Sequence, residues 1–230
     1  MTSWLQDPSL MAATLTMWLP FISFLLIIMF TRNHHQISGG IAIASVAGSL
    51  AGAVFLLARN GGAYLPIHYS IKWLIAGYIS IPFGFLLDPL SLVMLSLVAA
   101  ISLLVQIYSL GYMAGDPGFS RYYAFQSLFA WAMMGLTISS AMLQLYVFWE
   151  LVGLSSYLLI GFWYERFSAT QAGKKAFVMT RLGDVSFFIG LLLVLLHVGN
   201  LEILEINRPE IATQMSSGTL TLAALFTMSR

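Results

Sequence analysis

Charge and cysteine are scarce in this sequence. Only 8% of its 230 residues are Asp, Glu, Lys or Arg, and cysteine is absent. A soluble domain carries about 25% charged residues, so this composition excludes an ordinary soluble fold. The absence of cysteine excludes disulfides, thiol catalysis and iron–sulfur ligation by these residues. The net charge of +1 offers no basic surface, so no nucleic-acid partner is expected.

Apolar residues make up 59% of the chain. A stretch of about 20 apolar residues can cross a bilayer as a helix. The sequence therefore predicts an all-α polytopic membrane protein with six complete transmembrane helices, at residues 11–30, 37–58, 88–108, 122–141, 143–163 and 176–197. A shorter apolar stretch at 219–228 predicts the start of a seventh helix. The alternating pattern within 60–87, such as HYSIKW, predicts a hairpin loop on the outer face.

Lys and Arg are unevenly divided between the two ends of the predicted helices. Loops one, three and five carry Arg32, Arg121, Arg166, Lys174 and Lys175, whereas the other side carries Arg59, Lys72 and Arg208. Positive loops stay in the cytoplasm, so we expect the N-terminus outside, in a bacterial inner membrane. The N-terminus has no basic segment and no small-residue cleavage site, so no cleaved signal peptide is expected.

Glu150 is a carboxylate inside the apolar run QLYVFWELVGLSSYLLIGFW, residues 144–163. An ionisable group at membrane depth costs about 2.5–3.5 kcal/mol or more, which indicates a use for the proton or cation that it can hold. Tyr146, Gly153 and Tyr157 share its helix face and could line a polar path. The structural alternative is a carboxylate satisfied by Ser, Tyr or backbone partners.

Three further charges lie in the next predicted helix. Lys174 and Arg181 are seven positions apart and so lie on one side, and Asp184 follows Arg181 by three and can pair with it. These charges form either a fixed ion pair or an electrostatic element that biases the protonation of a neighbour. Asp88 precedes Pro89 and suits a helix N-cap. The four histidines are not spaced for a haem or metal site.

Several motifs resemble the antiporter-like subunit L (subunit 5) of respiratory complex I. They are FWELVGLSSYLLIGFWYE, KKAFVMTRLGDVSFF (174–188), FGFLLDPLSLVMLSLV (83–98) and FSRYYAFQSLF (119–129). The motifs extend from about residue 83 to residue 190, whereas residues 1–82 agree in hydropathy more than in motif. The resemblance divides the chain into N-terminal helices and an outer loop (1–82) and the start of the antiporter-like domain (83–230).

The resemblance implies a proton-translocating membrane subunit of the enzyme NADH:quinone oxidoreductase. Glu150 would be the central acid of the proton path, and Arg181 and Asp184 would form a switchable ion pair that tunes it. Lys174 would belong to the same electrostatic element, and Asp88 would have a weaker role. The partners would be other membrane subunits of complex I and the lipid bilayer. No redox centre is expected in this chain, because NAD, FMN, iron–sulfur clusters and quinone would bind partner subunits.

The chain also departs from the family pattern. Family members are much longer, and their interrupted seventh helix carries a lysine that pairs with the glutamate, yet no Lys follows Lys175 here. We therefore expect an N-terminal portion, a truncated product or one half of a split subunit. Two alternatives stay open. One is the large subunit of a multisubunit sodium/proton antiporter or inorganic-carbon uptake complex, and the other is an inactive truncated scaffold.

Overall fold

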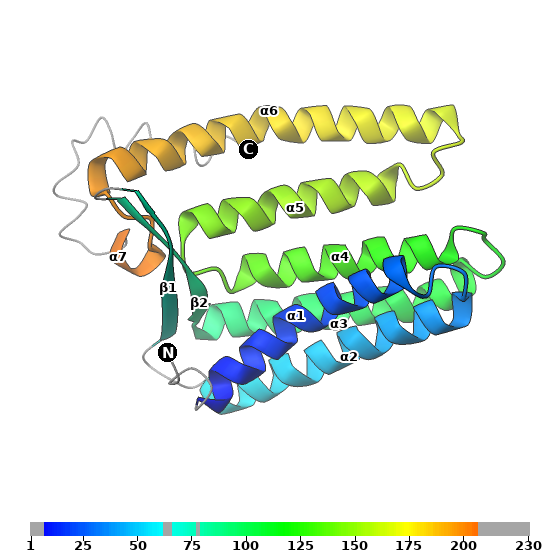
Figure 1. Ribbon diagram of the computed structural model, residues 1–230, viewed down its shortest axis with the longest axis horizontal. Helices are drawn as coiled ribbons and strands as arrows, with labels where there is room; N and C mark the ends of the chain where they lie inside the picture. Colours follow the sequence, from blue (N-terminus) through cyan, green and yellow to red (C-terminus); the bar gives the residue numbers. More distant parts are fainter. Residues whose placement is uncertain (1–6, 62–65, 77–78, 207–230) are drawn as a thin grey trace.

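The computed structural model describes residues 7–61, 66–76 and 79–206 (Figure 1). Its elements, in chain order, are α1 (Pro8–Met29), α2 (His35–Asn60), β1 (Ile67–Ala76), β2 (Ile79–Leu87), α3 (Pro89–Tyr112), α4 (Phe119–Thr137), α5 (Met142–Ile160), α6 (Phe167–Val198) and α7 (Ile203–Ile206). The predicted start of a further helix at 219–228 lies outside the described residues.

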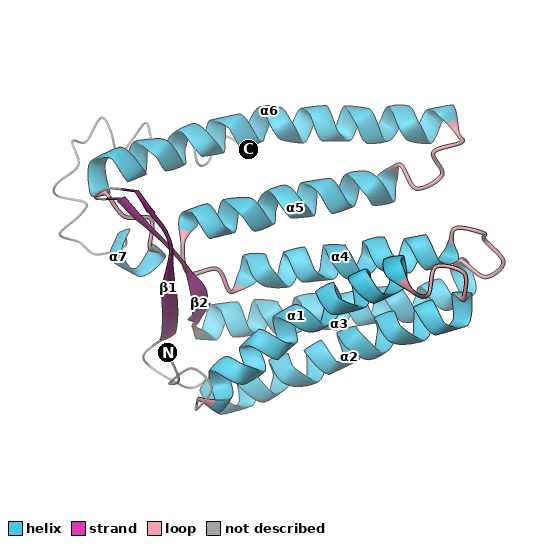
Figure 2. Ribbon diagram, in the orientation of Figure 1, coloured by secondary structure: helices cyan, strands magenta, loops and turns pink. Residues whose placement is uncertain are grey.

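The long helices run side by side along one direction, and the two strands lie across one end of them (Figures 1 and 2). Helices α1 to α4 form a bundle, α5 packs on α4, and α6 packs on α5. The main hydrophobic core joins the bundle to the hairpin and to α5, and it includes Met17, Leu56, Leu87, Leu95 and Phe148. Helix α6 is therefore the outermost long helix, and many of its apolar side chains are exposed.

Five helices in the described part of the chain are long and apolar enough to cross a membrane, namely α1, α2, α3, α5 and α6. This agrees with five of the six predicted spans. The remaining predicted span, 122–141, falls on α4, which is a helix but is not among these five. Helix α4 packs against α1, α2, α3 and α5 and buries Ser120, Gln126 and Ser127. A helix enclosed by other helices needs no apolar surface toward lipid, which explains its lower hydropathy.

The hairpin predicted between the second and third helices is present. Strands β1 and β2 pair antiparallel, with Ile67 opposite Leu87 and Ser70 opposite Gly84, so the fold is mostly helical rather than all-α. Glycine is required at position 84, because a Cβ there would collide with the carbonyl oxygen of Tyr69. The position of the hairpin on the outer face stays a prediction.

The segment after α6 turns back against the α4–α5 connection. Helix α6 ends at Val198 and is capped by Gly199, whose φ of 72° is the left-handed conformation that glycine adopts readily at a helix C-terminus. The backbone N–H of Met142 then donates to the carbonyl of Leu201 at 2.8 Å, and that of Ile203 donates to Ser140 at 3.0 Å. These bonds fasten the end of α6 to the start of α5.

Candidate functional site

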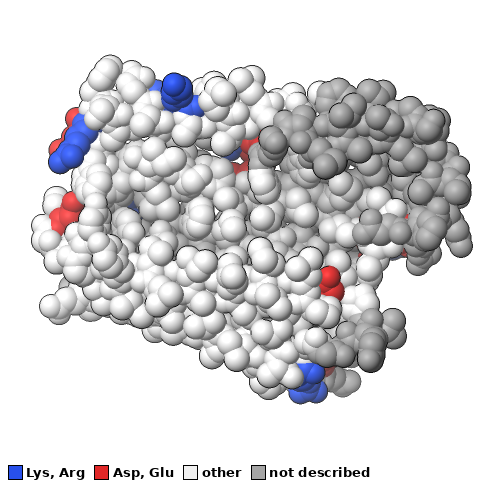
Figure 3. All heavy atoms as spheres, turned by 180° about the vertical axis from the view of Figure 1, so that it is seen from behind, with Lys and Arg blue, Asp and Glu red and all other residues white. Residues whose placement is uncertain are grey.

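An ionic cluster joins α5 to α6. The Nη1 atom of Arg181 pairs with an Oε atom of Glu150, and the same Nη1 lies 3.9 Å from an Oδ atom of Asp184. The side chain of Asp184 is only 4% exposed and that of Glu150 19%, whereas Arg181 is 34% exposed. Figure 3 shows that Lys, Arg, Asp and Glu side chains are few on one face of the molecule, apart from its margins and a small group inside an opening.

The antiparallel packing of α5 and α6 explains how these charges meet. On one side of Glu150, the ring of Tyr146 lies 5.7 Å from that of Phe187 and 5.3 Å from that of Phe188. On the other side, the ring of Tyr157 lies 5.2 Å from that of Phe177. The predicted face of α5 therefore faces α6, with its carboxylate between two aromatic contacts.

Arg181 is held by its surroundings as well as by the carboxylates. Its guanidinium carbon lies 4.4 Å from the ring centre of Phe177, which is a cation–π contact. A Cβ at Gly153 would lie 3.8 Å from an Nη atom of Arg181, an ordinary van der Waals contact, so α5 approaches the guanidinium closely at this glycine. The Nε atom of Arg181 is buried and makes no hydrogen bond in the described part of the chain. The cation is thus positioned mainly by Glu150, Asp184 and Phe177.

Two predicted site residues lie apart from the cluster. Lys174 is exposed on α6 and forms no ion pair with any described residue. Asp88 is the N-cap of α3: its Oδ1 accepts a hydrogen bond from the backbone N–H of Ser91 at 2.8 Å, and Ser91 Oγ completes a capping box. Pro89 occupies the first turn, so this carboxylate has a structural use at the helix start. A role of either residue in proton movement stays a prediction.

One polar cluster was not predicted from the sequence. His68 of β1 lies 2.5 Å from the carboxylate of Glu202, and Ser70 Oγ donates to the same carboxylate at 3.2 Å. Ser70 and Glu202 are 132 residues apart, and no local pattern signals such a pair. It links the hairpin to the segment that follows α6.

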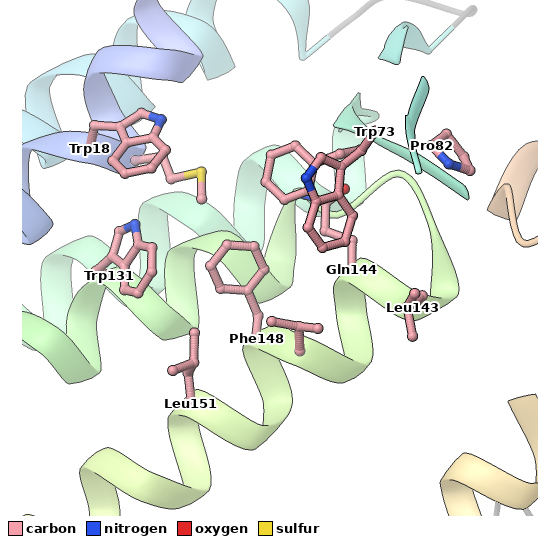
Figure 4. Close-up of a pocket in the computed structure, with 11 residues that line it drawn as sticks. Trp18, Trp73, Pro82, Trp131, Leu143, Gln144, Phe148 and Leu151 are labelled. Atoms are coloured by element: carbon pink, nitrogen blue, oxygen red, sulfur yellow. The ribbon is translucent and has the colours of Figure 1, made fainter. Parts of the chain in front are cut away.

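A cavity of about 240 Å³ lies between α1, the hairpin, α4 and α5 (Figure 4). Trp18, Trp73, Trp131 and Phe148 are among its lining residues, and Gln144 contributes an amide. That amide donates to the carbonyl of Gly84 and accepts from its N–H, both at 2.9 Å. The cavity is therefore apolar and lies on a different face of α5 from Glu150. No group of three or more His, Asp or Glu residues in the described chain could hold a metal.

Two family models match the chain. The model described as "NADH-Ubiquinone oxidoreductase (complex I), chain 5 N-terminus" matches residues 73–123, and the model "NADH:quinone oxidoreductase/Mrp antiporter, TM" matches residues 139–230. The second match contains the whole ionic cluster. The chain belongs to the chain 5 (subunit L) family of NAD(P)H:quinone oxidoreductases. The resemblance noted in the sequence is thereby confirmed.

Curated members of the chain 5 family are similar over much of this chain. NAD(P)H-quinone oxidoreductase chain 5 of Synechocystis is 40% identical over 83% of the chain, which covers 28% of that protein. The chloroplastic subunit 5 of Chlorokybus atmophyticus is 42% identical over 67% of the chain, which covers 24% of it. The chain thus spans about a quarter of the length of these relatives.

A solved structure has the same fold. It is described as the membrane-bound sulfane sulfur reductase, an archaeal respiratory membrane complex. The TM-score is 0.76 at 16% sequence identity, and the match covers 94% of this chain and 43% of the other. The arrangement of helices and hairpin is therefore shared across distantly related sequences.

Proposed function

We propose that this chain forms part of a proton-translocating, antiporter-like membrane subunit of NAD(P)H:quinone oxidoreductase. The observation that carries the proposal is the pairing of Arg181 with Glu150, with Asp184 nearby. Glu150 is the group that takes and releases a proton, because it is only partly buried and its charge depends on one shared cation. Arg181 moves between the two carboxylates, and Asp184 accepts it when Glu150 is protonated.

The chemistry of this site requires no redox group among these residues. A carboxylate in a medium of low dielectric constant holds its proton unless a cation stabilises the charged form. Withdrawal of Arg181 toward Asp184 therefore favours proton uptake at Glu150, and its return favours release. In this proposal NAD, FMN, iron–sulfur clusters and quinone bind partner subunits, and the electron transfer there drives the movement of Arg181. Lys174 modulates the cluster from two turns away.

The proposal also includes an arrangement in the membrane. Helix α4 crosses the bilayer as a sixth span within the bundle, and residues 83–230 begin the antiporter-like domain while 1–82 provide the first two helices and the hairpin. The distribution of Lys and Arg supports an N-terminus and hairpin on the outer side of a bacterial inner membrane. Other membrane subunits of the oxidoreductase are the partners.

Glu150→Gln in the assembled complex tests the proposal. We expect proton pumping, measured as acidification of inverted membrane vesicles on NAD(P)H addition, to fall by at least about tenfold, because glutamine cannot carry the proton. Glu165→Gln is the matched control, since Glu165 is an exposed carboxylate fifteen positions along. Pumping that survives Glu150→Gln unchanged would instead support a scaffold without a transport role.

A sodium/proton antiporter is the second candidate, because the model that matches residues 139–230 covers both families. Transport driven by a sodium gradient without any NAD(P)H oxidation would favour it. Pumping that requires NAD(P)H and is indifferent to sodium would favour the oxidoreductase.

A further inference from the structure

Two cavities adjoin Arg121 at the end of the bundle that is opposite the hairpin. The first, of about 230 Å³, lies between the end of α1 and the start of α4. The second, of about 210 Å³, lies between α4, the end of α5 and the start of α6. Arg121 and Phe125 line both cavities, and Arg32 lines the first. One guanidinium therefore forms part of two neighbouring grooves.

The guanidinium of Arg121 is fixed in place without an acidic partner. One Nη donates to the carbonyl oxygen of Phe162 at 3.1 Å, and the guanidinium carbon lies 4.8 Å from the ring centre of Phe162 and 4.9 Å from that of Tyr164. Its Nε is buried and makes no hydrogen bond with any described residue. The Nη1 donors, unlike Nε, are not among the buried atoms and are bonded to no described residue, and a fixed, planar guanidinium of this kind suits the oxygen atoms of a phosphate group.

The charges around this guanidinium leave it short of negative partners. Among the described residues, neither Arg121 nor Arg32 forms an ion pair. Asp116 is the carboxylate on the adjoining loop, but its oxygens accept hydrogen bonds from the backbone N–H of Gly118 at 2.6 Å and from Trp163 Nε1 at 3.0 Å. Two arginines therefore face the first groove with one occupied carboxylate nearby.

The groove becomes apolar with distance from the arginines. Ile28 lies near the end of α1, four positions before Arg32 in the following loop, and Phe125 follows Arg121 by one turn of α4. Both apolar side chains therefore lie deeper along the helices than the cations do. An arginine that merely extends its charged end into water would not need a guanidinium held by a carbonyl and two rings. The order of cations and apolar walls matches a headgroup above an acyl chain.

We infer that Arg32 and Arg121 bind the phosphate of an anionic phospholipid, whose acyl chain lies along Ile28 and Phe125 between α1 and α4. A zwitterionic lipid fits less well, because its ammonium group would face the same two cations. The site lies at the end to which loops one, three and five belong, and anionic lipids are enriched on the cytoplasmic surface that the Lys and Arg bias predicts for that end. The inference does not depend on proton translocation by Glu150.

Lipid retention by the native membrane complex that contains this chain tests the inference. The complex is placed in nanodiscs with equal phosphatidylglycerol and phosphatidylcholine, extracted with mild detergent, and its retained lipids are counted by native mass spectrometry. We expect the wild type to retain phosphatidylglycerol selectively. Arg32→Gln and Arg121→Gln should each lower that retention by about fivefold, since one arginine near a membrane surface contributes that much to anionic lipid binding.

Three further measurements make the result decisive. Arg59→Gln, which removes an exposed arginine at the opposite end of α2, should change nothing. Arg121→Lys keeps the charge and should retain more lipid than Arg121→Gln, whereas equal losses would point to a disturbed fold around Phe162. Displacement by inorganic phosphate would show a free phosphate site instead. Equal retention of both lipids, an equal loss in Arg59→Gln, or retention only after partner subunits are stripped away would overturn the inference.

Discussion

Phe177 is the residue whose effect on the ionic cluster can be isolated most cleanly. It carries no charge, yet its ring lies 4.4 Å from the guanidinium carbon of Arg181 and 5.2 Å from the ring of Tyr157. It therefore supports the cation from α6 while also packing on α5. Substitution at this position changes the placement of Arg181 but leaves every ionisable group present.

Phe177→Leu should lower proton pumping severalfold while the complex still assembles. A cation–π contact contributes about 0.5–2 kcal/mol, and without it Arg181 spends less time between Glu150 and Asp184. The measurement is vesicle acidification at equal complex content. Phe177→Tyr, which keeps an aromatic ring beside Arg181, should retain most of the proton pumping. Phe188→Leu is the control, because Phe188 contacts Tyr146; an equal loss there would mean that general packing of α5 on α6 is responsible.

Asp88 separates a structural use of a carboxylate from a proton-carrying use. Asparagine is as good an N-cap as aspartate but cannot take part in proton transfer. We therefore expect Asp88→Asn to keep both thermal stability and pumping, and Asp88→Ala to lower the free energy of unfolding by about 0.5–2 kcal/mol. Thermal unfolding in detergent and vesicle acidification measure the two effects. A loss of pumping in a stable Asp88→Asn complex would assign Asp88 to the proton path.

Elements far apart in the sequence are joined by single side chains, and Gln144 is the clearest example. This buried glutamine at the start of α5 makes two hydrogen bonds to Gly84 in the middle of β2, both at 2.9 Å. The hairpin is thus attached to the helix that carries Glu150. The side-chain amide supplies both a donor and an acceptor, so it pairs both the N–H and the carbonyl of Gly84.

Gln144→Leu should destabilise the attachment of the hairpin. It leaves the N–H and the carbonyl of Gly84 buried without partners, at about 1–3 kcal/mol each, so the free energy of unfolding should fall by about 2–6 kcal/mol. The unfolding temperature of the purified complex reports this. Gln171→Leu, at an exposed position of α6, should have little effect. An unchanged unfolding temperature in Gln144→Leu would show that water or another protein group pairs with the N–H and the carbonyl of Gly84 in the variant.

Most of the helices could be predicted from the sequence, because a helix surface that faces lipid must be apolar. Five spans were recognised since their surfaces must be apolar, and the hairpin was recognised from alternation in 60–87. The role of α4 was harder to predict, since a helix enclosed by helices loses that requirement. The face of α5 that carries Glu150 and the pairing of Arg181 with Asp184 depend on residues close together in the sequence, so both could be predicted. The partners of His68 and Gln144 were not, because they depend on how distant segments come together.

At the scale of the whole molecule, the hairpin connects the bundle to the outermost helix. His68 and Ser70 hold Glu202, and the backbone around Glu202 is itself bonded to the α4–α5 connection. Helix α6 packs chiefly on α5 along its length, so this link at its end is a second, independent attachment. This link lies at the opposite end of the helices from the groove lined by Arg32 and Arg121.

Glu202→Gln should loosen the hairpin without unfolding the helices. The charge-assisted contact to His68 is lost, so the backbone amides of β1 should exchange with deuterium severalfold faster, as measured by mass spectrometry on the intact complex. Exchange in α1 and α3 should be unchanged. Lys72→Gln, at an exposed position of the same strand, is the control. If both variants exchange like the wild type, the contact contributes little to the attachment.

The ionic cluster contains an odd number of ionisable groups. Two carboxylates lie beside one guanidinium, so the formal charges of these three side chains sum to minus one when both acids are ionised. Net charge in a medium of low dielectric constant is costly, and in the proposed function one proton on either acid brings the sum to zero. Asp184→Asn would instead bring the formal charges of Glu150 and Arg181 to zero with no proton bound.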